Sequence, residues 1–289
     1  MNNKKISKEN LIKTLFLLTG IISCAAVVII TIYLVIAGIP AITAIGLKDF
    51  IFNTQWASTA KVPSYGIGAF ILTSIYGTLG AILLGVPIGF LTALYISKIA
   101  TNRVKSILEH CVNLMAGIPS VVYGLLGMLL LVPAIRAIFD LPDGSGLLAA
   151  ILVLAIMILP SVIKVSLMAL NAVPEEYEDA SLALGATEVE TYVRVSVPAA
   201  KSGIAAAIVL GVGRAIGEAM AVMMVAGNVA NMPSLFQSVR FLTTAVAGEM
   251  SYSAGLQREA LFSIALVLFI FIMGINIFLN RLLKRSGNK

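Results

Sequence analysis

The chain has 289 residues, of which 59% are hydrophobic and only 12% are charged. Soluble domains are roughly half apolar and about a quarter charged, so this composition excludes a soluble enzyme, a disordered chain and a disulfide-stabilised domain. It favours an all-α integral membrane protein. The net charge of +6 indicates basic loops beside anionic lipid headgroups, not a nucleic-acid partner.

Six long stretches with few charged residues predict six transmembrane helices, because a helix needs about 20 apolar residues to cross roughly 30 Å of hydrocarbon. None alternates as the strands of a membrane barrel do. Five contain no Asp, Glu, Lys or Arg, and the fifth in chain order contains only Arg214 and Glu218. The stretches cover residues 14–47, 62–97, 110–135, 144–163, 202–239 and 260–280.

The basic residues predict that both termini lie in the cytoplasm, in agreement with the positive-inside rule. The lysine-rich start resembles a signal peptide, but the apolar run after it is too long for one, so it is interpreted as a retained first helix. The cytoplasmic residues are then Lys4, Lys5, Lys8, Lys13, Lys98, Arg103, Lys105, Lys164, Arg194, Lys201, Arg281, Lys284, Arg285 and Lys289, against Lys48, Lys61, Arg136, Arg240 and Arg258 outside.

This topology divides the chain into a cytoplasmic N-terminal segment (residues 1–13), a six-span transmembrane domain (14–282) and a cytoplasmic tail (283–289). Residues 48–66 and 227–259 are expected outside the cell, and residues 136–146 form a short external turn rich in Pro and Gly. The largest cytoplasmic segment, residues 164–201, carries the most specific pattern.

Two short helices separated by a turn are predicted within that segment. Pro174 at the first helical position, followed by acidic residues, is typical of a helix start, and Gly185 is placed to end the helix. Thr187 and Glu190 have capping-box spacing, which predicts a second helix that runs to about Pro198. The alternative is a long solvated loop.

The same segment resembles the EAA signature of ABC importer permeases, through Glu178-Asp179-Ala180, Gly185 and, after nine residues, Val195-Ser196-Val197-Pro198. The resemblance implies a type I (MetI-like) permease fold in which residues of about 170–198 form a coupling helix that docks on an ATPase subunit. Docking would bury the turn, with the two acids facing basic residues of the partner. The implied coupling residues are Glu178, Asp179, Ala180, Leu182, Ala183, Leu184, Gly185 and Pro198.

Arg214 and Glu218 are expected to share one helical face, since they are four residues apart. A lone Arg near the bilayer centre costs about 2.5–3.5 kcal/mol, so the two form either a self-neutralising ion pair or part of a substrate path. A guanidinium suits tetrahedral oxyanions. Glu218 would limit the strength of binding and accept a hydrogen bond from protonated phosphate. Gly213 and Gly217 predict close helix packing.

Further stretches resemble the PstC-type permease of phosphate importers over about residues 10–285: Trp56, Tyr65-Gly66-Ile67, and the runs 117–124 and 213–218. In that family the matching Arg and Glu, here Arg214 and Glu218, are implicated in phosphate translocation. The resemblance implies one permease subunit of an ATP-driven importer in a bacterial or archaeal cell membrane. Its partners would be a PstA-type permease, two ATP-binding subunits that use ATP and Mg, and an external phosphate-binding protein.

Four alternatives remain at the level of the sequence. They are the PstA-type sister subunit, a permease for sulfate or molybdate, an ion-driven secondary transporter and a membrane enzyme. The chain has no P-loop pattern, so it is not expected to hydrolyse ATP itself. No cofactor or metal site is expected either, since there are only two thiols, Cys24 and Cys111, and one histidine, His110.

Overall fold

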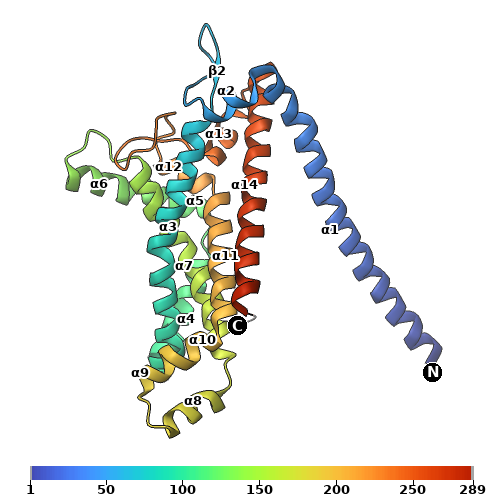
Figure 1. Cartoon of the computed structure of the whole chain (residues 1–289), viewed down its shortest axis with the longest axis vertical. Helices are drawn as coiled ribbons and strands as arrows, with labels where there is room; N and C mark the ends of the chain where they lie inside the picture. The colour runs from blue at the N-terminus through green and yellow to red at the C-terminus, as the bar shows by residue number, and fades with distance from the viewer. Residues whose placement is uncertain (1, 288–289) are drawn as a thin grey trace.

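The computed structural model describes the backbone of residues 2–287 and the side chains of residues 10–279 and 281. Lys4, Lys5, Lys8, Lys284, Arg285 and Lys289, which the charge count uses, lie outside the described side chains. The described chain is helical apart from loops and one short hairpin (Figure 1). The elements are α1 (Asn2–Ile45), α2 (Leu47–Phe52), β1 (Trp56–Ala57), β2 (Ser64–Tyr65), α3 (Gly68–Leu94), η1 (Tyr95–Ile99), α4 (Asn102–Gly117), α5 (Ser120–Leu126), η2 (Gly127–Leu131), α6 (Val132–Phe139), α7 (Leu147–Asn171), α8 (Glu175–Ala183), α9 (Glu188–Thr191), η3 (Tyr192–Ser196), α10 (Val197–Ala199), α11 (Lys201–Gly217), α12 (Met220–Val225), α13 (Leu242–Glu249) and α14 (Gly255–Gly287), where η marks a π-helical turn.

Helix α7 forms the centre of the bundle and packs against both α3 and α11. Small residues on α3 allow this close approach. A Cβ atom at Gly80 would lie 2.6 Å from Ile151, and one at Gly89 would lie 2.9 Å from Val162. Small residues at helix contacts are typical of membrane bundles, where van der Waals packing drives association.

Helix α1 is long and largely separate from the bundle (Figure 1). It contacts α14 near its C-terminal end, where the Tyr33 and Phe262 rings meet edge to face. Most of its apolar side chains are exposed, including those of Phe16 and Ile36. In a bilayer such a surface faces lipid or another subunit.

Five helical segments of the described chain are long and apolar enough to cross a membrane: Asn10–Ile45, Gly68–Ile99, Ser120–Phe139, Leu147–Asn171 and Gly255–Leu279. A sixth crossing requires the pair Glu188–Ala199 and Lys201–Gly217, which are bent by 70° to one another. The number of spans therefore stays a prediction.

Two apolar stretches are not the continuous helices that the sequence predicts. The stretch 110–135 breaks at Ile118 and Pro119, between α4 and α5. The stretch 202–239 ends its first helix at Gly217, continues briefly as α12 and then becomes an extended loop. Pro87 and Pro160, by contrast, lie inside the unbroken helices α3 and α7.

Different elements lie at the two ends of the described bundle. Figure 1 shows α8, α9 and α10 at the end toward which α14 descends and from which α1 starts, with β2, α2 and α13 at the opposite end. The predicted topology likewise groups residues 164–201 with both termini. Which end faces the cytoplasm stays a prediction.

Candidate functional site

Arg214 makes one side-chain hydrogen bond to the described part of the chain. Its Nη1 atom donates to Ser161 Oγ on α7 at 2.9 Å, and the Arg214 residue is half-buried. Arg214 is the fourteenth residue of α11, so it lies about 20 Å from the start of that helix. This depth places the cation well inside the apolar segment. Its position in the last turn of α11 also favours a cation, because the helix dipole is negative there.

Glu218 lies beyond the end of α11, so the expectation that it shares a helical face with Arg214 is wrong. Its backbone is extended, with φ −73° and ψ 129°. The Ala221 N–H donates to Glu218 Oε1 at 2.9 Å, so the carboxylate caps the start of α12. Thr243 in α13 also holds the break between α11 and α12, since its hydroxyl donates to the Glu218 carbonyl at 2.7 Å.

The two charged side chains do not pair with each other. Among the residues whose side chains are described, no carboxylate lies within 4.0 Å of the Arg214 guanidinium. A self-neutralising ion pair is therefore not the arrangement found here. The negative end of the α11 dipole offsets part of the Arg214 charge, and the positive end of the α12 dipole offsets part of the Glu218 charge. Only one of the five Arg214 N–H donors bonds a described side chain, so the others can bond a ligand.

A second expectation, that Gly213 and Gly217 allow close packing against another helix, is not met within the described chain. A Cβ atom built at Gly213 or at Gly217 would meet nothing within 4 Å. These glycines therefore mediate no close helix packing within the described chain. The space beside both glycines is open among the residues that the structure describes.

The segment expected to couple to an ATPase forms a helical hairpin, α8 followed by α9–η3–α10. Gly185 has φ +88°, and the Gly185 and Ala186 N–H groups bond the carbonyls of Leu182 and Ser181. This is the Schellman pattern, which needs a residue that tolerates positive φ. The expected Thr187 capping box also forms, and these hydrogen bonds lower the pKa of the Glu190 carboxyl.

Glu178 faces the interior of the protein and not a partner. Its carboxylate pairs with Lys98 in η1, which follows α3, and accepts a hydrogen bond from Ser196 Oγ at 2.8 Å. The Lys98 and Glu178 side chains are only 13% and 17% exposed. Glu178 therefore ties the hairpin to the bundle, which corrects the expectation that it contacts basic residues of another subunit.

Residue spacing supports the same correction. The EAA signature has three residues between its triplet and its Gly, whereas four separate Ala180 from Gly185. The triplet therefore matches Asp179-Ala180-Ser181, and Asp179 takes the acidic position. Asp179 is exposed, as are Ala180, Leu182, Ala183, Leu184, Gly185 and Pro198.

Apolar side chains at the tip of the hairpin are exposed. Leu184 is 90% exposed and Leu182 is 42% exposed, with Val189 exposed beside them on α9. Exposed apolar patches of this kind mark contact sites for other proteins. The surface fits the predicted docking role, which stays a prediction.

A polar network at the opposite end of the bundle was missed by sequence reasoning. The Glu249 carboxylate pairs with Arg240 and accepts hydrogen bonds from Trp56 Nε1 at 3.3 Å and Gln257 Nε2 at 3.0 Å. Gln257 Nε2 also bonds Ser58 Oγ at 3.1 Å. Glu249 therefore joins the β1–β2 hairpin to α13 and α14, across separations of up to 193 residues that give no local signal.

Comparisons with known proteins agree on one family. A family described as "Binding-protein-dependent transport system inner membrane component" matches residues 85–288. Over 256 residues the chain is 37% identical to the probable ABC transporter permease protein YqgH of Bacillus subtilis (strain 168), covering 87% of this chain and 83% of that protein. It is 32% identical to the phosphate transport system permease protein PstC of Pasteurella multocida (strain Pm70), covering 83% and 82%.

A solved structure gives the same fold. The chain is similar to the inward-facing MetNI methionine ABC transporter, with a TM-score of 0.57 and 22% identity, over 76% of this chain and 94% of that one. At this identity the likeness concerns the fold.

Proposed function

The chain belongs to the family of binding-protein-dependent transport system inner membrane components, and from that premise we propose that it is the PstC-type permease subunit of an ATP-driven phosphate importer. The family assignment makes it a multi-pass membrane protein with the MetI-like permease fold. Relatives named as PstC permeases in several organisms support phosphate as the substrate.

Arg214 is the observation that carries the proposal for an anionic substrate. It lies inside an apolar segment, bonds one neutral hydroxyl and has no carboxylate within 4.0 Å among the described side chains. An uncompensated Arg costs several kcal/mol in a bilayer and is typical of a substrate path. Its planar donors match a tetrahedral oxyanion.

Glu218 supports phosphate over sulfate. One of its oxygens caps α12, which leaves the second to accept a hydrogen bond from a protonated ligand. Monohydrogen phosphate supplies such a proton, and sulfate at neutral pH does not. Glu218 would also keep the anion from binding Arg214 too tightly for release.

The subunit would form half of the translocation pathway, with a PstA-type permease as the other half. Two ATP-binding subunits would dock on the α8–α9 hairpin, and an external phosphate-binding protein would contact residues 48–66 and 227–259. ATP binding closes the ATPase pair, moves the hairpins and opens the cavity outward; hydrolysis then returns it inward. The ATPase activity lies in the partner, and this chain contributes no catalytic residue.

Competition during uptake tests the substrate. In cells that lack this chain and are rescued by the wild type, labelled phosphate uptake should resist a large excess of sulfate or molybdate. It should stop when the ATPase subunit is inactivated and survive collapse of the ion gradient while ATP is maintained. Competition by sulfate or molybdate would assign another oxyanion, and dependence on the gradient alone would indicate a secondary transporter.

A further inference from the structure

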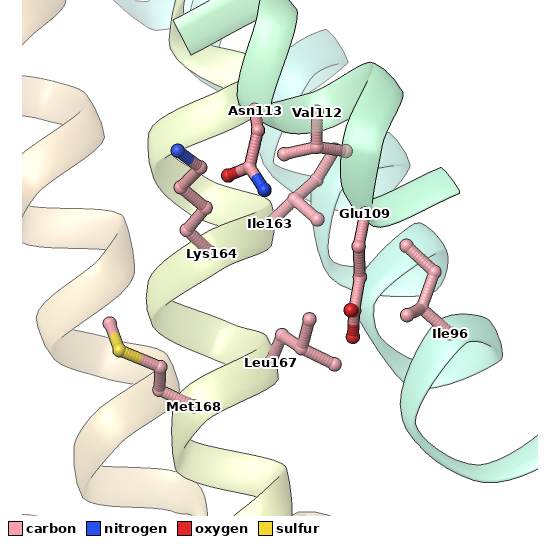
Figure 2. A pocket seen from close by; sticks show the side chains of 8 residues that line it. All are labelled: Ile96, Glu109, Val112, Asn113, Ile163, Lys164, Leu167 and Met168. Atoms are coloured by element: carbon pink, nitrogen blue, oxygen red, sulfur yellow. The ribbon is translucent and has the colours of Figure 1, made fainter. Parts of the chain in front are cut away.

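A pocket of about 210 Å³ lies between η1, α4 and α7 (Figure 2). Figure 1 shows α4 in the half of the bundle nearer to α8. Its apolar lining includes Ile163 and Leu167, and three polar side chains enter it: Asn113 and Glu109 from α4, and Lys164 from α7. Figure 2 shows the Lys164 amine and the Asn113 amide toward one end of the pocket, and the Glu109 carboxylate toward the other. The volume is several times what one water molecule needs.

None of these three polar side chains has a partner within the described part of the chain. Lys164 and Glu109 are half-buried and Asn113 is more exposed, and none of them lies in an ion pair or side-chain hydrogen bond there. An ammonium supplies three donors and an amide two. Donors that line a mostly apolar pocket without an internal partner are available to an external acceptor, and such surroundings strengthen the electrostatic attraction.

The pocket lies about one helical turn along α7 from the residue that Arg214 bonds. Lys164 follows Ser161, the partner of Arg214, by three residues on α7, so the two lie on one helical face about 4.5 Å apart along the axis. On α4, Asn113 lies two residues before Met115, whose carbonyl accepts a hydrogen bond from the Tyr123 hydroxyl. Tyr123 is in turn within electrostatic range of Arg214.

We propose that Lys164 and Asn113 form a second oxyanion site, which receives phosphate from Arg214 and passes it toward the α8 end of the bundle. The inference rests on the proposed function, since it extends the path of the same substrate. Transport requires sites that bind strongly enough for entry and weakly enough for release, which successive sites achieve. Glu109 at the far end of the pocket repels the anion and favours its departure.

Chemical rescue of the charge tests the site. Lys164→Cys is made in a background with Cys24→Ala and Cys111→Ala, and the full transporter is purified, modified and reconstituted into vesicles. Loss of a charge-assisted hydrogen bond should lower phosphate uptake about tenfold or more. A thiol reagent that adds an aminoethyl group should restore uptake, whereas one that adds a sulfonatoethyl group should not. Lys201→Cys, at an exposed position on α11, is the matched control and should show neither effect.

The outcomes separate this inference from the proposed function. If the wild-type complex imports phosphate and Lys164→Cys does so equally well, or if both reagents rescue it equally, the second site is wrong and the importer stands. If the wild type imports no phosphate, the proposed function fails and the site with it. If Lys164→Cys does not assemble, Lys164→Met, whose side chain is nearly as long but uncharged, should show the same loss of uptake. Normal uptake by the Lys164→Met variant would overturn the site.

A lipid headgroup has the same phosphate chemistry as the substrate. Inorganic phosphate should slow modification of the thiol in the Lys164→Cys variant at constant ionic strength, in vesicles of phosphatidylcholine alone. The same modification is then measured in vesicles with increasing fractions of anionic lipid. If the thiol is protected in proportion to that fraction and inorganic phosphate has no effect, the pocket binds a lipid and the proposal is overturned.

Discussion

The Glu218 carboxylate caps α12, and we propose for it a second role in phosphate transport that substitution can separate from the cap. Glu218→Gln keeps an oxygen that accepts the Ala221 N–H but removes the negative charge. We expect normal assembly, a lower KM for phosphate and a lower maximal uptake rate, because the anion then leaves Arg214 more slowly. Glu218→Ala removes the cap as well and should cost about 1 kcal/mol of stability. Unchanged kinetics in Glu218→Gln would leave only the cap.

Glu178 and Asp179 are neighbours with opposite surroundings, so the same amidation should have different effects. Glu178→Gln breaks the partly buried pair with Lys98 and should destabilise the hairpin on the order of 2 kcal/mol. Faster hydrogen exchange in α8 would report this loss. Asp179→Asn, at an exposed site, should leave that exchange unchanged and weaken only co-purification of the ATPase. The reverse result would return Glu178 to the docking surface.

At the scale of the element, the turn between α8 and α9 depends on one backbone conformation. Gly185 has φ +88° with open space around it, so Gly185→Ala should cost roughly 1–2 kcal/mol through the left-handed backbone alone. Gly185→Pro cannot adopt this φ and should uncouple ATP hydrolysis from uptake while the chain still reaches the membrane. Gly274→Ala, in open space on α14 without positive φ, is the control. Retained uptake in Gly185→Pro would contradict the docking model.

The hairpin was also the element that the sequence predicted best, for a physical reason. Gly185, Thr187 and Glu190 act on backbone groups within a few residues of themselves, so their spacing carries the structure. The break at Gly217 has no such signal, because apolar residues continue after it and hydropathy does not register a change of direction. Contacts such as Arg214 with Ser161 depend on how distant helices pack.

At the scale of the whole molecule, α13 links the β1–β2 hairpin to the candidate substrate path. Thr243 in its first turn bonds the Glu218 carbonyl, and Glu249 at its end pairs with Arg240 and holds Trp56. We expect Glu249→Gln to weaken stimulation of the ATPase by the binding protein and to leave the unstimulated rate unchanged. Glu259→Gln, at an exposed position on α14, is the matched control. Normal stimulation in Glu249→Gln would make the network purely structural.

Reconstituted phosphate uptake by the complete transporter tests the central claim, that Arg214 of a phosphate permease contacts the substrate. Vesicles with the wild type, Arg214→Gln and Lys201→Gln would be compared at equal amounts of assembled complex. We predict ATP-dependent uptake, resistant to excess sulfate, for the wild type and Lys201→Gln, and loss of at least about tenfold for Arg214→Gln with its ATPase partners still bound. Equal phosphate uptake by Arg214→Gln and the wild type would contradict the account.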